Sequence, residues 1–165
     1  MTFFSKVFEK ALYIRVTEHL NTNNFLVRNQ FGFRKATATE DAIFKLTNEI
    51  LKALKNKRLA GSIFCDLEKA FDSVNHDILL SKLSYYGTSG KATFLLKSYL
   101  QNRYQRILIT NSLFNSKSFK MDQIKRGVPQ SSILGPLLFL LYINDIPKSV
   151  KHKAFPISFA DDTSI

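Results

Sequence analysis

The chain has 165 residues, of which 45% are hydrophobic, so it can bury a core and lacks the composition of a disordered protein. Its 24 Lys and Arg residues outnumber its 13 Asp and Glu residues, and the net charge of +11 predicts a polyanionic partner. The single cysteine, Cys65, excludes an intrachain disulfide and favours a reducing, intracellular location. The longest apolar run, residues 133–143, is too short to span a bilayer and is expected to lie in the core. Charge alone does not separate nucleic acid from an anionic membrane surface, but no membrane partner is expected.

Helices and one short strand are predicted along the first hundred residues. Apolar residues at helical spacing predict a helix over residues 3–20, and Thr39 is placed to cap a second helix. The run SIFCDL (62–67) is short and apolar, which predicts a buried strand. Ser73 or Asn75 then caps a helix that ends at Gly87, and a further helix follows over about 90–101. The second helix is expected to bury one apolar face, formed by Ala42, Ile43, Leu46, Ile50 and Leu54.

The remaining residues predict a hairpin, a helix and two short strands. The runs YQRILITNS (104–112) and SKSFKMDQI (116–124) flank a loop, as hairpin strands do. A helix fits about 132–144, and the runs PISFA (156–160) and TSI (163–165) then form two strands hinged at an Asp-Asp pair. Helices and strands interleave without a regular βα alternation, so the predicted fold class is α+β.

Carboxylates follow two of the predicted strands. Asp66 ends the run SIFC, and Asp161 with Asp162 ends the run ISFA. If these strands are neighbours in one sheet, the three carboxylates meet, and their mutual repulsion favours bound hard cations such as Mg²⁺. The alternative is an ordinary exposed turn, because aspartate is common in turns. The three histidines are scattered and no glycine-rich nucleotide motif occurs, so neither zinc nor a dinucleotide site is expected.

Ordered motifs then indicate a family. FCDLEKAFDSVNHDIL (64–79), RGVPQSSILGPLLFLLYINDIP (126–147) and FADD (159–162) resemble motifs A, B and C of reverse transcriptases, with the closest likeness to the non-LTR retrotransposon (LINE-like) class. FFSKVFEKALYIRVTEHL (3–20) and NQFGFRKATATEDAI (29–43) resemble the segments that precede motif A in that class. The matches occur in the family's order and span nearly the whole chain.

The resemblance implies a right-hand polymerase of fingers and palm, with an antiparallel palm sheet packed on helices. Residues 1–60 would be part of the fingers, and residues 61–165 the palm, with a hairpin insertion on the fingers side at about 102–125. It also implies that the chain is a fragment, since the upstream part of the fingers and the thumb would lie outside it.

The implied reaction is RNA-templated DNA synthesis. Asp66, Asp161 and Asp162 would be catalytic and would hold two Mg²⁺ ions, with Mn²⁺ as a substitute. The 3′-OH of a DNA primer would attack the α-phosphorus of a dNTP on an RNA template and release pyrophosphate. Insertion of such elements takes place in the nucleus, which is the location that the resemblance implies, although no targeting signal is visible.

The resemblance places three further side chains at the nucleotide. Phe71 would lie under the sugar and exclude a 2′-OH, Gln130 would contact the nucleotide near its sugar, and Arg34 would face the template or the triphosphate. Each has a plainer alternative, because phenylalanine fills cores, loop glutamines are common and surface arginines are solvated.

The backbone after the first strand is a candidate phosphate site. If residues 67–70 turn from strand into helix, the N–H groups of Leu67 to Ala70 can receive triphosphate oxygens. Lys69 would add positive charge there, unless it is an ordinary surface lysine. Farther along, Arg103 and Arg106 flank Tyr104, a pattern that suits backbone contact with base stacking but also an ordinary basic hairpin.

Two positions depart from the family pattern. Motif B usually reads PQGS, and here Ser131 replaces the glycine; motif C has Phe159 where many relatives carry tyrosine. A serine can crowd the nucleotide or be forced to a φ value that it disfavours, so we expect lower activity than in a Ser131→Gly variant.

Three alternative functions stay open. The chain could be a decayed or co-opted fragment that binds RNA without polymerising. An RNA-dependent RNA polymerase is disfavoured, because that class has a small residue where Phe71 stands and glycine where Ala160 stands. Group II intron and retron-type reverse transcriptases are nearer relatives, but QFGFRK and LLYINDIP favour the LINE-like class.

Overall fold

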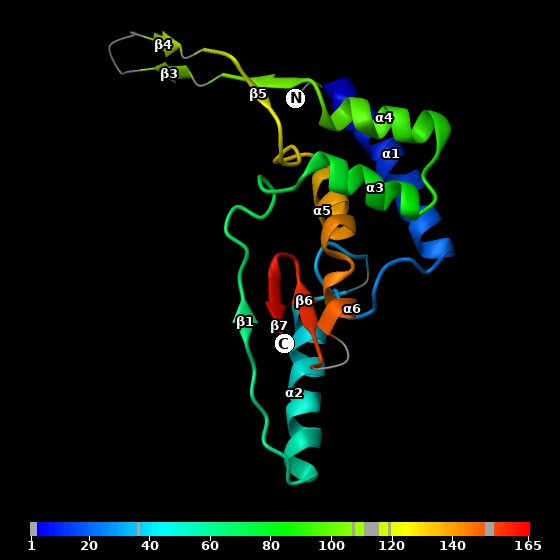
Figure 1. The fold of residues 1–165 in the computed structure, drawn as a ribbon, viewed down its shortest axis with the longest axis vertical. Coiled ribbons are helices and arrows are strands. Elements are labelled where there is room, and N and C mark those ends of the chain that lie inside the picture. Colours follow the sequence, from blue (N-terminus) through cyan, green and yellow to red (C-terminus); the bar gives the residue numbers. More distant parts are fainter. Residues whose placement is uncertain (1–2, 36, 107, 111–115, 119, 151–153) are drawn as a thin grey trace.

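The computed structural model describes residues 3–35, 37–106, 108–110, 116–118, 120–150 and 154–165. Helices and short antiparallel strands alternate along the chain, which confirms a mixed fold (Figure 1). The helices are α1 (Phe3–Thr22), α2 (Thr39–Lys55), α3 (His76–Tyr85), α4 (Gly90–Leu100), α5 (Gly135–Ile143) and α6 (Ile146–Val150). The strands are β1 (Phe64–Cys65), β2 (Arg103–Gln105), β3 (Leu108–Thr110), β4 (Ser116–Ser118), β5 (Asp122–Ile124), β6 (Ile157–Phe159) and β7 (Asp162–Ser164).

Helix α5 is the centre of the core. Its sequence GPLLFLLYI is apolar on every side, as in a helix surrounded by protein, and Pro136 lies in the first turn, where a missing N–H costs nothing. Helices α1, α3 and α4 pack around its upper part (Figure 1), and their buried residues join it in one cluster. The members from those helices are Leu20, Leu79, Leu83, Leu96 and Leu100.

The sheet below this core has the strand order β1-β7-β6, and both pairings are antiparallel. Strands β6 and β7 form the predicted hairpin, with Ser158 and Thr163 buried on the side away from solvent. A second hairpin consists of the β2–β5 and β3–β4 ladders, as the sequence predicted, and its loop residues 111–115 lie outside the described residues.

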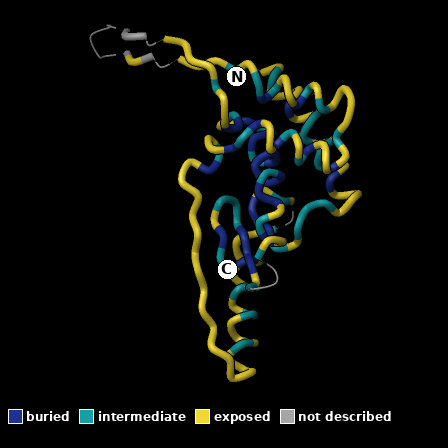
Figure 2. The backbone as a smooth tube through the Cα atoms, in the orientation of Figure 1, coloured by how far each residue is buried: buried dark blue, intermediate teal, exposed yellow. Residues whose placement is uncertain are grey.

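Two predictions about burial were wrong. The run SIFCDL forms only a two-residue strand, and Phe64 is 75% exposed, because β1 is an edge strand that pairs on one side with β7 alone. Figure 2 shows this segment as a continuous exposed trace. On α2, Ala42 is buried but Ile43, Ile50 and Leu54 are exposed, because the sheet packs against only part of the helix.

The helix caps were predicted with mixed success. Asn75 caps α3 as expected, since its side-chain oxygen accepts from the N–H groups of Asp77 and Ile78. Thr39 was the wrong cap for α2. The N-cap is Ala38, whose N–H donates to the Asp41 carboxylate at 2.8 Å. This is the contact that the acid makes in a capping box, and alanine has no side-chain oxygen to make the reciprocal one.

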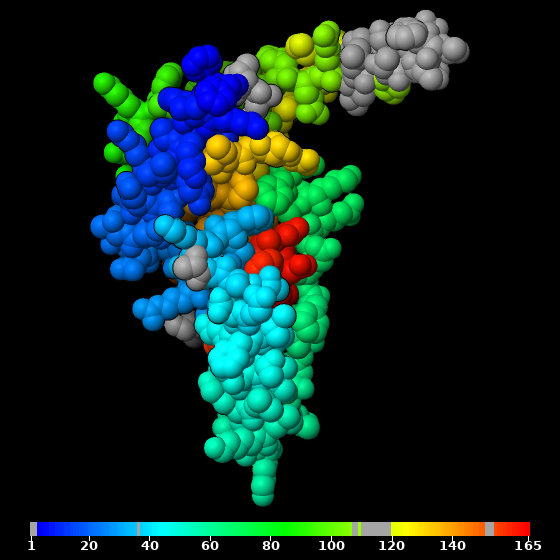
Figure 3. Space-filling model, turned by 180° about the vertical axis from the view of Figure 1, so that it is seen from behind, coloured from blue at the N-terminus to red at the C-terminus, as the bar shows by residue number. Residues whose placement is uncertain are grey.

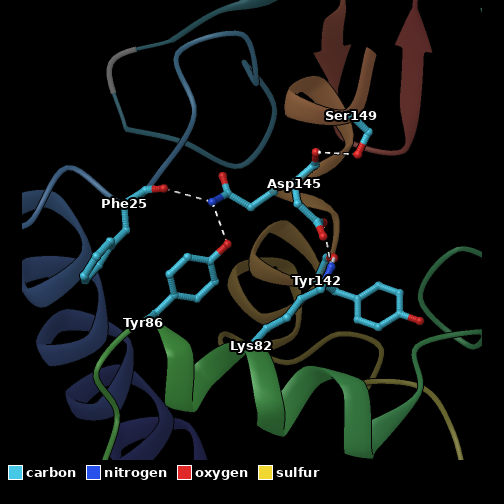
Figure 4. A network of polar contacts seen from close by, with 7 residues as sticks. Phe25, Lys82, Tyr86, Tyr142, Asp145 and Ser149 are labelled. Atoms are coloured by element: carbon cyan, nitrogen blue, oxygen red, sulfur yellow. Dashed lines mark hydrogen bonds and ion pairs between the residues drawn. The ribbon is translucent and has the colours of Figure 1, made fainter. Parts of the chain in front are cut away.

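A buried amide ties the loop after α1 to α3 and α5. Asn144, 1% exposed, donates to the carbonyl of Phe25 and to the hydroxyl of Tyr86, both at 2.9 Å, and accepts from the N–H of Val27. Beside it, Lys82 pairs with Asp145 at 2.6 Å (Figure 4). Among the described helices, none has the length and apolar character needed to cross a membrane.

A buried carboxylate joins α1 to the segment that leads into α5. Glu9 is 2% exposed, and its oxygens accept from the N–H of Ile133 at 2.7 Å and from the hydroxyl of Tyr99 at 3.3 Å. Burial raises the pKa of Tyr99 to about 12, so this hydroxyl keeps its proton and remains a donor. Glu9 therefore satisfies a backbone donor that has no other acceptor in the described part of the chain.

We expect Glu9→Leu to lower the free energy of unfolding by about 1–3 kcal/mol, because it leaves the partly buried N–H of Ile133 without an acceptor. Glu9→Gln retains an acceptor oxygen and should cost less. Urea unfolding followed by circular dichroism measures both, with Glu18→Leu on the exposed side of α1 as the matched control. Equal stability of the Leu and Gln variants would contradict this role for Glu9.

Candidate active site

The pairing of β1 with β7 brings the predicted carboxylates to one end of the sheet. Cys65 pairs with Thr163, so the next residues on the two strands, Asp66 and Asp162, come opposite each other. Both line a hollow of about 360 Å³ between the sheet and α2. Asp161 lies beside them in the turn between β6 and β7. From behind, the C-terminal hairpin is seen between the segment that leads into α2 and the β1 segment (Figure 3).

The electrostatics of this place suit a cation. In the described part of the chain, none of the three carboxylates forms an ion pair with a lysine or arginine. The described residues also contain no group of three or more His, Cys, Asp or Glu side chains close enough to hold a metal ion by themselves. Mg²⁺ usually takes one or two carboxylates and completes its shell with water and substrate phosphate. Two of the expected ligands, Asp66 and Asp162, line one hollow, and a cation there would need water or substrate oxygens to complete its shell. The described residues do not bring all three carboxylates together as a metal-binding group, so the magnesium site stays a prediction.

The turn that carries Asp161 has an unusual backbone. Ala160 adopts φ 55°, and Asp161 does not, which is the φ pattern of a two-residue type II′ hairpin. Glycine is the usual residue at that first position, and an L-residue there costs about 1–2 kcal/mol. The surrounding structure must therefore hold this turn in place.

Residues 67–73 form turns instead of the expected start of a helix, since α3 begins only at His76. Lys69 adopts φ 52°, and its carbonyl accepts from the N–H groups of Asp72 and Ser73. The backbone N–H groups of Leu67 to Ala70 have no hydrogen-bond acceptor in the described part of the chain. They remain available to an anion, although without a helix dipole behind them. The Lys69 side chain is exposed, and its expected contact with phosphate stays a prediction.

Phe71 packs between the core helix α5 and the loop before α2. Its ring stacks on Phe139 of α5 with 4.7 Å between centroids, and it meets the edge of Phe33 at 5.8 Å. Its carbonyl accepts from the N–H of Val128 in motif B at 2.9 Å. The ring is half-buried, so core packing fixes the position at which the family's sugar-contacting residue would stand.

Motifs A and B are joined by a side-chain pair that the sequence did not indicate. The amide nitrogen of Gln130 donates to both carboxylate oxygens of Asp72, at 3.0 and 3.2 Å. Gly127 makes this contact possible, because a Cβ there would lie 2.9 Å from Cα of Asp72. The position of Asp72 next to Phe71 in the run AFDS was the only available signal.

The structure gives Arg34 hydrogen bonds within its own loop. Its Nη1 donates to the carbonyls of Val27 at 2.7 Å and Gln30 at 3.3 Å, and burial lowers the pKa of the guanidinium. Contact with template or triphosphate stays a prediction for this residue. Sequence reasoning also missed Gln30, whose buried side chain reaches the β6–β7 turn.

The basic hairpin is placed beside motif B. Arg103, Gln130 and Arg126 line a groove of about 940 Å³ at the base of β2 and β5. Tyr104 is 59% exposed, which leaves its ring free for stacking, whereas Arg103 is half-buried and burial lowers its pKa. The exposed ring of Tyr104 is therefore compatible with base stacking, and contact of this hairpin with a nucleic acid stays a prediction.

Comparison with known proteins defines the class. The sequence profile of the family described as reverse transcriptase (RNA-dependent DNA polymerase) matches residues 1–165. The chain is 33% identical over 174 residues to "Probable RNA-directed DNA polymerase from transposon BS" of Drosophila melanogaster, covering 98% of the chain and 18% of the relative. It is 34% identical over 170 residues to "Probable RNA-directed DNA polymerase from transposon X-element" of the same species, covering 98% and 17%. The chain thus spans less than a fifth of these relatives.

Solved structures share the fold. Apo telomerase from Candida tropicalis, truncated from its C-terminal domain, superposes with a TM-score of 0.59 at 18% identity, covering 94% of this chain and 32% of that one. Telomerase from Candida albicans in complex with a TWJ fragment of telomeric RNA gives 0.60 at 13% identity, covering 98% and 30%. The chain belongs to the reverse transcriptase family. Its relatives among retrotransposon polymerases confirm the non-LTR resemblance.

Ser131 provides a test of backbone strain in motif B. It adopts φ 59°, which costs an L-residue about 1–2 kcal/mol. We expect Ser131→Gly to raise the free energy of unfolding, but by no more than about 1 kcal/mol, because glycine also loses more entropy on folding. Urea unfolding measures the difference.

The adjacent serine is the matched control. The Ser132 hydroxyl donates to the carbonyl of Pro129 at 2.6 Å and accepts from the N–H of Gly135 at 2.9 Å. Ser132→Gly should therefore destabilise the chain by about 1–3 kcal/mol. Destabilisation of similar size by both changes would show that Ser131 is not strained.

Proposed function

We propose that this chain carries the catalytic part of an RNA-directed DNA polymerase, which extends a DNA primer on an RNA template with dNTPs. The observation that supports this most is the β1–β7 pairing, which brings Asp66 and Asp162 to one hollow with Asp161 in the adjoining turn. In this proposal residues 1–60 serve as part of the fingers and residues 61–165 as the palm. The hairpin at about 102–125 lies on the fingers side, and a thumb is supplied from outside the chain.

The three carboxylates have a defined part in the proposed reaction. Asp66, Asp161 and Asp162 would hold two Mg²⁺ ions, or Mn²⁺ as a substitute, which when bound neutralise charge on the phosphoryl group and acidify the primer 3′-OH. The chain itself keeps this place open to solvent and free of competing lysine or arginine partners among the described residues. A substrate phosphate can therefore approach the carboxylates without displacing a protein cation.

The proposed bond changes follow from the substrates. The 3′-oxygen of the primer forms a bond to the α-phosphorus, the bond from that phosphorus to the bridging oxygen breaks, and pyrophosphate leaves. The hydroxyl proton passes to water. In this proposal the N–H groups of residues 67–70 receive triphosphate oxygens, and the ring of Phe71, which stacks on Phe139, lies under the sugar. Gln130, held by Asp72, would orient the nucleotide from the motif B side.

The proposed setting is a retrotransposon polyprotein. The curated relatives are retrotransposon polymerases several times longer than this chain, which supports the view that the remaining fingers and thumb belong to the same product. Target-primed insertion would place the protein in the nucleus.

A second candidate function is RNA binding without synthesis. The net charge of +11 and the exposed basic residues at the base of the hairpin, Lys125 and Arg126, support it. Such a protein would use its surface and not its carboxylates. The two functions therefore differ in whether the activity of the chain depends on the Asp161 carboxylate.

Primer extension on an RNA template distinguishes them. With a DNA primer, dNTPs and Mg²⁺, we expect extension by the chain and a loss of at least about 100-fold in Asp161→Asn, because even outer-shell partners of metal ligands cost 10–100-fold. Asp77→Asn, an exposed acid at the start of α3, is the matched control and should extend normally. Ser131→Gly should extend faster than the natural sequence.

Two results would contradict the polymerase function. One is equal extension by the natural chain and Asp161→Asn. The other is filter binding of RNA by the chain, unchanged in Asp161→Asn, with no extension under any condition; this result supports the RNA-binding function instead.

Phe71 gives a test of sugar selection. Phe71→Val removes most of the ring, so we expect discrimination against ribonucleotides to fall by at least about tenfold in the ratio of kcat/KM values for dNTP and NTP. The loss of stacking on Phe139 will also lower stability, so the assay is run at a temperature at which circular dichroism shows the variant folded. Phe94→Val, which changes an exposed ring on α4, is the control. An unchanged ratio would make Phe71 a core residue only.

A further inference from the structure

Gln30 joins the loop before α2 to the turn that carries Asp161. Its side chain is a buried polar group, with 2% of the residue exposed. The amide nitrogen donates to the carbonyl of Ala160 at 3.2 Å, and the amide oxygen accepts from the N–H of Gly32 at 2.9 Å. One side chain thus uses both its donor and its acceptor to connect two backbone segments that are far apart in sequence.

The backbone around Gln30 extends the sheet. The N–H of Phe31 donates to the carbonyl of Ser158, and the N–H of Ser158 donates to the carbonyl of Asn29, both at 2.8 Å. Gln30 and Ser158 form a parallel bridge. Residues 29–31 therefore cover the outer edge of β6, on the side opposite β7. This edge is fixed, whereas β1 on the other side of the sheet is short and exposed.

Gly32 allows the same segment to approach the turn closely. A Cβ at residue 32 would lie 2.0 Å from the nitrogen and 2.6 Å from the Cα of Ala160, so only glycine permits this approach. The backbone of residue 32 and the amide of Gln30 therefore contact the one residue of the hairpin with φ 55°. The strained turn is held from outside the hairpin.

The atom that Gln30 contacts determines which peptide of the turn it can hold. The carbonyl of Ala160 belongs to the peptide unit that links Ala160 to Asp161. A hydrogen bond to that oxygen fixes the plane of the peptide, and the plane sets the direction in which the Asp161 side chain leaves the backbone. Rotation of this peptide would change the direction of the Asp161 carboxylate relative to Asp66 and Asp162, which line the adjoining hollow.

We propose that Gln30 is a positioning residue of the polymerase site, which holds the Ala160–Asp161 peptide so that the Asp161 carboxylate faces the same cations as Asp66. The inference rests on the proposed function, because it assigns Gln30 a role toward the metal-binding carboxylates. It adds a contact from residues before α2 to the geometry of motif C. Loss of this contact should weaken metal binding by about tenfold, as for other outer-shell partners of metal ligands.

The test measures binding of Mn²⁺ by electron paramagnetic resonance of the free ion, without catalysis. Gln30→Met keeps the length of the side chain and removes both hydrogen-bonding groups. Gln30→Glu keeps the acceptor for Gly32 but places an oxygen against the Ala160 carbonyl. We expect both to bind Mn²⁺ about tenfold more weakly than the natural chain. Gln101→Met, at the end of α4, is the matched control and should bind normally.

Asp161→Asn separates failure of this inference from failure of the proposed function. If the natural chain and Asp161→Asn bind Mn²⁺ equally, the carboxylate site itself is wrong. If Asp161→Asn loses affinity while folded Gln30→Met and Gln30→Glu bind as the natural chain does, only the role of Gln30 is overturned. If both Gln30 variants are unfolded at 4 °C by circular dichroism, Gln30 belongs to the fold and not to the site, which also overturns the proposal.

A second readout separates positioning from general damage. In primer extension, the Gln30 variants should need about tenfold more Mg²⁺ for half-maximal rate, while filter binding of RNA is unchanged. A purely structural role predicts a lower amount of active protein with the same Mg²⁺ dependence, and that result counts against positioning.

Discussion

The candidate site depends on a short backbone pairing between segments far apart in sequence. Phe64 pairs with Ser164 and Cys65 with Thr163, and Ile63 and Ile165 exchange two more hydrogen bonds at 2.8 and 2.9 Å. This pairing is what brings Asp66 opposite Asp162. Since Phe64 is 75% exposed, little burial supports β1, and each exposed hydrogen bond contributes only about 0.5–1.5 kcal/mol. The motif A carboxylate is therefore attached to the sheet by its least stable strand.

The other parts of the site are built on the buried core. Phe71 stacks on Phe139 of the central helix α5, and the carbonyl of Phe71 binds motif B through Val128. The loop that leads to Gln30 is held by Asn144 at the end of the same helix. Motif B, the turn of motif C and the ring of Phe71 thus share one support, the buried core around α5. Adjustment of the site on binding should come mainly from β1, because regions with few buried contacts open most easily.

The sequence predicted the order and pairing of the helices and strands better than it predicted which of their faces are buried. Two short apolar runs that each end in aspartate predicted that Asp66 and the Asp161 turn lie at the same end of one sheet. This could be predicted because apolar runs and turn residues are local features of the sequence. The exposure of Ile43 on α2 was not predictable, since helical spacing shows that a face is apolar and not what covers it. Likewise, nothing in SIFCDL distinguishes an edge strand from a buried one. The inward hydrogen bonds of Arg34 depend on loop carbonyls that only the folded chain brings together.

Backbone strain explains why the detailed geometry of the site could not be predicted from local sequence patterns. Among the described residues, seven that are not glycine have φ between 52° and 59°. Four of them, Phe33, Lys69, Ser131 and Ala160, lie in or next to the motif segments, and the other three, Asn24, Lys57 and Asn102, lie outside them. Such conformations persist only where neighbouring structure enforces them, and they concentrate at functional sites. Two of these four are contacted from distant segments: Phe33 by the ring of Phe71, and the Ala160 carbonyl by Gln30. The Lys69 carbonyl accepts from two N–H groups of its own turn. The shape of the hairpin turn is therefore fixed in part by tertiary contacts, and it depends on residues outside motifs A, B and C as well as on residues within them.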